Sequence, residues 1–165
     1  SKDSLGIWSI TLSNVSDQIF EYHFNVDGTQ VCDPQNMYLS PTKGFKPSIA
    51  YAKYGPYYMY ASSPMEHGTI NYDYATGTAI YSHPKADDNA PVITLLIGKN
   101  DTVESWMKVG NANAMADILI AENKCKPCKI IVTNQTNGGI SINADDYSSW
   151  QERIAALEKV LISMN

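Results

Sequence analysis

The sequence predicts a mixed α/β protein, with a small β-rich part first and a larger α/β part after it. The first observation is a set of strand-length runs rich in alternating β-branched and aromatic residues, within residues 7–12, 19–26 and 69–82. The second is the order of two apolar runs, 92–97 and 129–133, with a helix-period pattern between them. Such an order is typical of a βαβ unit, whose crossover is right-handed. We place the boundary between the two parts after residue 62, giving ranges 1–62 and 63–165.

The length, net charge and apolar runs of the chain limit the classes of partner that it is expected to bind. A chain of 165 residues can bury one sizeable core or two small ones. Its formal charge of -5 argues against nucleic acid and against an anionic membrane surface. No apolar run approaches the roughly 18 residues of a membrane span. The first four residues do not form a signal peptide, so we expect that any export signal was removed or never existed.

The N-terminal third predicts a β-hairpin and one further strand. Residues 7–12 alternate as a half-buried strand does, and residues 19–26 form a second strand. Asp27 and Gly28 then make a tight turn into residues 29–32, because an Asp-Gly pair between alternating runs favours a hairpin. Three aromatic residues here are expected in the core rather than on a ligand surface: Trp8, Tyr22 and Phe24.

The remaining elements follow in order. Residues 69–74 and 78–82 predict a hairpin, and residues 92–97 predict a strand buried on both faces. A single helix is expected over residues 103–123, before the strand at 129–133. A second helix, starting near residue 150, has one apolar stripe: Trp150, Ile154, Leu157, Leu161 and Met164. Ser148 or Asp146 is expected to cap it, with Glu152 in its first turn.

Two of the three cysteines, Cys125 and Cys128, have the spacing of a redox motif. Redox reactivity requires the first cysteine at a helix N-terminus, whereas this pair follows a helix and precedes a strand. We therefore predict a surface loop that could form a local disulfide. A zinc site would need two more ligands at characteristic spacing, and none is present, so we predict no metal and no cofactor.

The larger part resembles the feruloyl esterase-like branch of the esterases, which are α/β-hydrolases that de-esterify plant polysaccharides. The similarity lies in residues 91–101, in Ser105-Trp106, in 109–113, in 119–124 and in 129–132. In the family, the corresponding segments have sequences close to P-V-L-Y-L-L-H-G, S-W, G-R-A-N and L-I-A-E-G-K, followed by a valine-rich strand. Residues 138–157 are similar to the end of the same esterases, where a G-G-H segment and a W-R-x-x-L helix close the domain.

The catalytic middle expected from this resemblance is missing. The family carries its nucleophile in a G-x-S-x-G turn, and the chain has no such motif. Ile140 stands where the family has the catalytic histidine. Of the oxyanion loop, Gly98 and Lys99 remain as a remnant, while Ile97 replaces the histidine. The resemblance therefore implies a truncated hydrolase sheet of about four strands, with one βαβ unit and a closing amphipathic helix.

The N-terminal part is similar to the latter half of an early-set immunoglobulin-like domain, through residues 6–12, 20–28 and 33–36. Such modules precede many esterases of this branch. The expected opening strands are absent, and Thr29 and Gln30 replace the aromatic residue of glycogen-binding versions. The resemblance implies an accessory β-module without starch binding.

Few residues remain as catalytic candidates, because acyl transfer needs a nucleophile, a base and oxyanion donors. Ser141 lies in Gly-Ile-Ser-Ile-Asn, which resembles the nucleophile motif except at its last residue. His67 precedes Gly68 at a place where the family has a histidine without a triad role. His23 and His83 have no motif around them. Ser141 and His67 are weak candidates, and we assign no catalytic residue.

A truncated sheet must hide the face and the edges that the missing elements would cover. If the resemblance holds, the strand at 92–97 becomes an edge, and the face opposite the helices is exposed and apolar. The aromatic stretch 48–60 or the N-terminal module could cover that face, or two chains could pair with two-fold symmetry. We expect a homodimer.

Three functions are open. The first is a non-catalytic relative of polysaccharide esterases, a pseudoenzyme that acts as a glycan-associated binding or assembly module. Eleven tyrosines and three tryptophans suit sugar stacking, although packing on a sheet is the more usual reason for such residues. The second is an active ester hydrolase with an unconventional serine and histidine. The third is a decayed gene product without a selected function. The resemblance implies a plant-type polysaccharide as partner and a secreted or periplasmic location.

Overall fold

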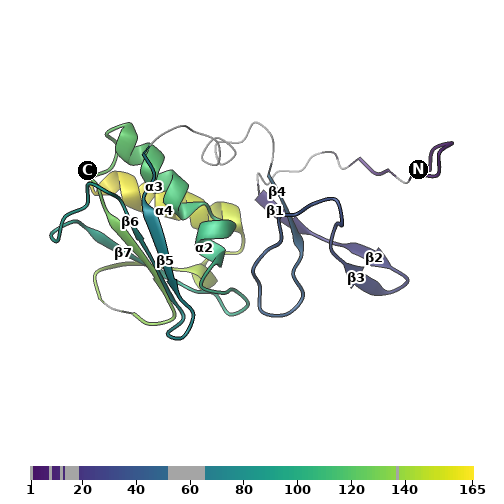
Figure 1. The fold of residues 1–165 in the computed structure, drawn as a ribbon, viewed down its shortest axis with the longest axis horizontal. Coiled ribbons are helices and arrows are strands. Elements are labelled where there is room, and N and C mark those ends of the chain that lie inside the picture. The colour runs from purple at the N-terminus through teal and green to yellow at the C-terminus, as the bar shows by residue number, and fades with distance from the viewer. Residues whose placement is uncertain (1, 8, 12, 14–18, 52–65, 137) are drawn as a thin grey trace.

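A computed structural model describes residues 2–7, 9–11, 13, 19–51, 66–136 and 138–165. The predicted mixed α/β fold class is confirmed. Two small antiparallel sheets come from the N-terminal third, and a mixed five-stranded sheet with helices follows (Figure 1). The predicted boundary after residue 62 lies outside the described residues.

The N-terminal strands pair in two separate ladders. β1 (Ile19–Tyr22) pairs with β4 (Ser48–Tyr51), and β2 (Phe24–Val26) pairs with β3 (Thr29–Val31). The single strand predicted over 19–26 is therefore two strands, because the chain changes partner at His23. The predicted turn is confirmed: Asp27 and Gly28 have φ of 49° and 84°, the positive values that a two-residue hairpin turn requires.

Two other predictions for the N-terminal part are wrong for the described residues, and a third is confirmed in part. Residues 7 and 9–11 form no strand, so the strand predicted over 7–12 is wrong for its described residues. Phe24 is 45% exposed on a hairpin whose residues are all exposed, so its predicted core position is also wrong. Part of the aromatic stretch 48–60 does supply a strand, since Ile49 of β4 is buried beside β1. Residues 52–60 and Trp8 lie outside the described residues.

The main sheet has five strands rather than about four. Its order is β5 (Thr69–Asp73), β6 (Thr78–Ser82), β8 (Lys129–Thr133), β7 (Val92–Leu96) and β9 (Ile140–Asn143). β5, β6 and β8 pair antiparallel, whereas β8, β7 and β9 are parallel. The predicted βαβ unit is confirmed by the parallel pairing of β7 and β8. The predicted edge position of β7 is wrong, because β9 adds to its free side.

The helix predicted over 103–123 is two helices, α2 (Ser105–Lys108) and α3 (Ala112–Ala121). The break has two local causes. Asn111 takes a left-handed conformation with φ of 48°, which ends a helix. Gly110 permits a close approach, since an added Cβ would lie 2.7 Å from the carbonyl oxygen of Trp106.

The closing helix α4 (Trp150–Ser163) docks through the predicted stripe. Trp150, Ile154, Leu157 and Leu161 are all buried. Its cap is Ser149 rather than Ser148 or Asp146: the Ser149 hydroxyl accepts a hydrogen bond from the Glu152 amide at 3.2 Å. Glu152 in turn accepts from the amide and hydroxyl of Ser148, each at 2.8 Å.

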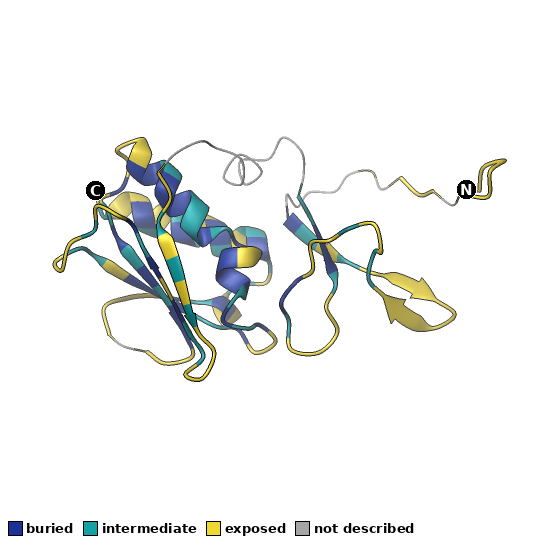
Figure 2. Ribbon diagram, viewed as in Figure 1, coloured by how far each residue is buried: buried dark blue, intermediate teal, exposed yellow. Residues whose placement is uncertain are grey.

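The core lies between the five-stranded sheet and the helices (Figure 2). Side chains alternate along each strand, and one face of the sheet supplies the apolar layer. Two tryptophans connect the helices, since the rings of Trp106 and Trp150 pack edge to face at 5.6 Å. The largest fully buried apolar side chains are Trp106, Tyr81, Ile93, Leu95, Met115, Ile130, Ile154, Leu157, Leu161, Val109 and Val132.

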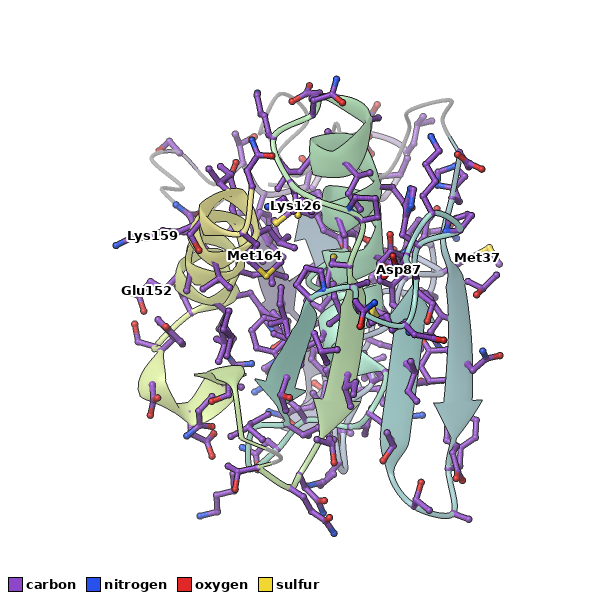
Figure 3. All side chains as sticks on the ribbon, turned by 90° about the vertical axis from the view of Figure 1, so that its left-hand side faces the viewer. Met37, Asp87, Lys126, Glu152, Lys159 and Met164 are labelled. Carbon is purple, nitrogen blue, oxygen red and sulfur yellow. The ribbon has the colours of Figure 1, made fainter. Side chains whose placement is uncertain are left out.

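The other face of the sheet carries no helix and is turned toward the viewer in Figure 3. The side chains that point to this face are identified from the pairing of the strands, because successive residues of a strand point to opposite faces of the sheet. It is less apolar than the resemblance implied, because polar side chains outnumber apolar ones: Thr69, Asn71, Asp73, Thr78, Ser82, Thr94, Lys129, Thr133, Ser141 and Asn143 against Ile80, Val92, Leu96 and Ile131. The prediction that this exposed face is apolar is therefore wrong.

Candidate functional site

His67 lies just before β5 and contacts a buried carboxylate. Its Nδ1 is 3.1 Å from Oδ2 of Asp117, which is 1% exposed, while the His67 side chain is 59% exposed. Oδ1 of Asp117 accepts from the hydroxyl of Tyr81 at 2.6 Å and from the amide of Gly68 at 2.9 Å. Burial and the neighbouring Asp117 raise the pKa of Tyr81 well above its usual value, so its hydroxyl stays a donor. The carboxylate thus fastens the start of β5, strand β6 and helix α3 together.

Gly68 is required by the same cluster. An added Cβ would overlap the ring of Tyr81, so the chain can pass this point only without a side chain. The His-Gly pair therefore has a packing role, because it brings the backbone amide within reach of Asp117. One feature of the sequence could have identified Asp117: it is a carboxylate within an otherwise apolar helix, and such residues are rarely buried without a partner.

Ser141 lies on β9, the strand at the opposite edge of the sheet. It pairs in register with Thr94, so its side chain points to the helix-free face. His67 precedes the other edge strand and contacts helix α3 on the opposite face. Four strand spacings separate the two edges, about 19 Å in all. The structure therefore does not bring Ser141 and His67 together.

The predicted oxyanion-loop remnant is engaged in the protein's own structure. The amide of Lys99 donates to Oδ1 of Asp145 at 3.1 Å, so this donor already has a carboxylate partner. Gly98 is needed for space, because an added Cβ would lie 2.7 Å from Oδ2 of Asp101. The turn closes through the Asp101 amide, which donates to the carbonyl of Gly98 at 3.0 Å.

An ion pair joins this turn to the last helix. Nη1 of Arg153 is 2.7 Å from Oδ2 of Asp101, and both side chains are largely buried. Nε of Arg153 donates to the carbonyl of Ala144 at 3.1 Å, and the guanidinium lies 4.6 Å from the ring centroid of Trp150. Sequence reasoning did not single out Asp101 or Arg153. The sequence did contain one indication of a buried charge, because Arg153 stands between Trp150 and Ile154, two buried positions of the helix.

A cavity of about 680 Å³ opens beside this ion pair. Its walls come from β1, from the loop at residues 42–47, from the turn after β7 and from the start of α4. The N-terminal loop is fixed to the turn by Lys43, whose amide donates to the Asn100 carbonyl at 2.8 Å and whose Nζ donates to the Lys99 carbonyl at 3.1 Å. Tyr51 also reaches across, donating its hydroxyl to the carbonyl oxygens of Lys108 and Val109. The cavity therefore lies where the two parts of the chain meet.

The remaining histidines have structural partners. His23 Nε2 lies 3.2 Å from the side-chain Nε2 of Gln30, and its ring packs edge to face on Phe45. Nδ1 of His83 accepts from the amide of Lys85 at 3.2 Å. Across the described part of the chain, no serine hydroxyl hydrogen-bonds to a histidine ring.

Cys125 and Cys128 are both buried thiols, so their predicted surface position is wrong. A hydrogen bond to Cys125 and burial raise the pKa of Cys128 far above its usual value, which keeps that thiol protonated. The pair follows the C-terminal end of α3, as predicted, where the helix dipole does not favour a thiolate.

Among the residues that the structure describes, no group of three or more His, Cys, Asp or Glu side chains could hold a metal ion. In the same residues, no helix has the length and apolar character that crossing a membrane requires.

Comparison with known proteins finds no matching family and no curated protein of similar sequence. The solved structures that share part of the fold include two esterases. A mutant of the feruloyl esterase module from Clostridium thermocellum, complexed with sinapinate, matches 49% of the chain with 16% identity and a TM-score of 0.40. Enterochelin esterase from Shigella flexneri matches 82% of the chain with 14% identity and a TM-score of 0.39.

These matches span only 32% and 37% of the two solved chains. The protein therefore has a distant structural similarity to esterases, limited to about a third of their length. The similarity concerns the fold and does not extend to an activity.

Proposed function

We propose that this protein is a non-catalytic relative of polysaccharide esterases that acts as a glycan-associated binding or assembly module. One observation carries the non-catalytic part. Ser141 and His67 lie at opposite edges and on opposite faces of the main sheet, about 19 Å apart by strand spacing. General-base activation of a serine requires a hydrogen bond of about 2.6–3.2 Å.

The occupied oxyanion-loop amide supports the same proposal. An oxyanion hole needs backbone donors that are free to meet the developing negative charge. The amide of Lys99 donates instead to the carboxylate of Asp145. A substrate oxygen would have to displace a charged acceptor of the protein itself, at a cost that opposes catalysis.

The glycan part of the proposal has its support in the sequence and in surface chemistry. The sequence motifs within residues 91–132 resemble those of esterases that act on plant polysaccharides. Several aromatic side chains are exposed, including Tyr38, Tyr74 and Phe45, and such rings can stack on the apolar faces of sugars. The partner we propose is a plant-type polysaccharide, met outside the cytoplasm in a secreted or periplasmic location.

An active ester hydrolase is the second candidate function, and one contact favours it. A buried carboxylate beside Nδ1 of an exposed histidine, as Asp117 is beside His67, orients an imidazole for general-base chemistry. Among the described residues, no serine hydroxyl hydrogen-bonds to the ring of His67.

Affinity electrophoresis tests the binding function. The whole chain is run through native gels with and without soluble arabinoxylan, and bovine serum albumin serves as the non-binding control. We expect the chain to be retarded by the polysaccharide. Equal mobility in both gels, at any polysaccharide concentration that the gel tolerates, contradicts the proposal.

A further inference from the structure

The cavity at the junction of the two parts has a rigid polar floor. Asp101 and Arg153 hold each other at 2.7 Å, and Arg153 is also fixed by the carbonyl of Ala144. These contacts use Nη1 and Nε of the guanidinium and Oδ2 of the carboxylate. No described residue is bonded to Nη2 of Arg153 or to Oδ1 of Asp101. Two residues that line the cavity thus carry a donor and an acceptor that no described residue uses, on side chains that the ion pair holds in place before a ligand arrives.

The rim of the cavity adds polar groups of both kinds. Glu21, on β1, and Asn100, in the turn after β7, line it with side chains that have no hydrogen-bond partner among the described residues. The hydroxyl of Ser149 accepts from the Glu152 amide, which leaves its own hydrogen to donate. A ligand here would meet both acceptors and donors.

Aromatic rings complete the walls. Phe45 is 41% exposed and is braced by the edge of His23, with ring centroids 5.6 Å apart. Phe20 lines the cavity from β1, and Trp150 lies at its base beneath the guanidinium of Arg153. An exposed but braced ring offers a flat apolar surface at little cost in conformational entropy.

The charges of the lining cancel. Lys43 and Arg153 are cationic, Glu21 and Asp101 are anionic, and histidine counts as neutral. A site for a phosphate, a sulfate or an acidic sugar would show an excess of cations. A volume of about 680 Å³ falls within the range of about 300–1,000 Å³ that is usual for ligand pockets.

We infer that this cavity binds a neutral oligosaccharide, with its hydroxyls on the floor formed by Asp101 and Arg153 and a ring face against Phe45. Paired donors and acceptors match vicinal hydroxyls, a flat ring matches the C–H face of a pyranose, and the balanced charge excludes a strong preference for anions. The inference rests on the proposed function, because it assigns the glycan class and the place of binding.

Isothermal titration of the whole chain with xylohexaose tests this site, with a galacturonate oligomer of equal length as the acidic comparison. Phe45→Ala should weaken xylohexaose binding about fivefold through loss of the stacked ring. Glu21→Gln, which keeps the shape and removes one charged acceptor, should weaken it by a similar factor. Phe24→Ala is the matched control, because Phe24 has nearly the same exposure, 45% against 41%, and lies outside the cavity.

Each outcome separates the site from the function. Binding by the wild type that falls in Phe45→Ala and Glu21→Gln, but not in Phe24→Ala, supports the site. Wild-type binding that both cavity variants retain places the ligand elsewhere and overturns the site, while glycan binding stands. Preference for the galacturonate oligomer overturns the neutral class. Absence of binding to either oligomer, together with equal mobility in arabinoxylan gels, overturns the proposed function as well. Thermal melts of each variant show whether a loss of binding reflects a loss of folding.

Discussion

At the scale of single residues, Asp117 has the most demanding position in the chain. It is a carboxylate with 1% exposure that receives hydrogen bonds from Tyr81 and Gly68 and contacts His67. Burying a charge is costly unless each of its lone pairs finds a donor. Its three partners come from parts of the chain that are 36, 49 and 50 residues away in sequence. Asp117 therefore stabilises tertiary structure rather than its own helix.

Replacing Asp117 tests this role. Asp117→Ala removes both acceptor oxygens and leaves the hydroxyl of Tyr81 and the amide of Gly68 without this partner. We expect the free energy of unfolding to fall by about 2–3 kcal/mol, the cost of unsatisfied buried donors. Urea denaturation measures it, and Asp88→Ala, at an exposed position, is the control. A change below about 0.5 kcal/mol, the size of an ordinary surface substitution, would contradict the role of Asp117.

Tyr81 makes the same cluster sensitive to high pH. Burial and Asp117 raise the pKa of Tyr81 above its unfolded value of 10.0. The folded state therefore holds this proton more tightly, so its stabilising contribution is complete below pH 10 and is lost as the pH rises above that value. Burial raises the pKa of Tyr72 to about 12, which adds to the slope.

We expect unfolding free energies measured in urea to fall steadily from pH 10 to pH 11.5. Each retained proton contributes about 1.4 kcal/mol per pH unit to this slope. Tyr81→Phe should be less stable at pH 8 and should show a shallower decline above pH 10. An unchanged slope in Tyr81→Phe would show that folding does not raise the pKa of this tyrosine.

At the scale of elements, α4 connects the core to the candidate binding cavity. Its apolar stripe packs on the sheet, while Ser149 and Arg153, at its start, line the cavity. The orientation of this helix thus controls the floor of the cavity. Its first turn is held by the Ser149 hydroxyl and by Glu152, which reaches back to Ser148.

Removing the cap tests how strongly the first turn is held. Ser149→Ala should lower the unfolding free energy by about 1 kcal/mol, while Ser149→Asp should retain most of it, because aspartate also caps a helix N-terminus. Chemical denaturation of the three proteins in parallel gives the comparison. Equal losses in the alanine and aspartate variants would contradict capping by the side chain.

Most of the strands could be predicted because their signals are local. Residues 69–82 alternate around a turn, and the runs before Leu96 and Thr133 are short and apolar. β9 was not predicted as a sheet strand, because its four residues become one only through parallel pairing with β7, which no local pattern encodes. The helix break was missed because the apolar period spans Gly110 and Asn111. That period shows neither the close approach of Gly110 to the Trp106 carbonyl nor the left-handed conformation of Asn111.

The candidate site was less predictable than the fold. Gly98 and Lys99 were located by motif, and the structure gives them a packing role and a hydrogen bond to Asp145. The partners that define the cavity, Asp101 and Arg153, are 52 residues apart in sequence. Ion pairs over such distances depend on how the elements pack, and residue spacing does not indicate them.

At the scale of the whole molecule, the helix-free face and the β9 edge are the surfaces through which two copies could pair. We propose a homodimer that covers one of them. The apolar positions on the face, Ile80 (40% exposed), Val92, Leu96 and Ile131, lie among polar residues. Such a mixed surface suits a moderate interface with two-fold symmetry better than a fully apolar one.

Light scattering of the wild type at micromolar concentration should give about twice the mass of 18.2 kDa. Ile80→Lys places a charge on the helix-free face and should shift the mass toward one chain if the face is the interface. Ile10→Lys is the control, because Ile10 is 80% exposed in the N-terminal segment. A wild type that is monomeric throughout this range rules out the dimer, and a dimer that survives Ile80→Lys points to the edge.

Ester hydrolysis is the measurement that tests the central claim most directly. Purified wild type, Ser141→Ala and His67→Ala are assayed with a nitrophenyl acetate and with a feruloyl ester. The separation of Ser141 from His67 predicts that all three turn over both esters at the same rate, no higher than buffer with an inert protein. Turnover by the wild type that falls about a thousandfold or more in Ser141→Ala, the loss expected for a catalytic serine, would contradict the claim.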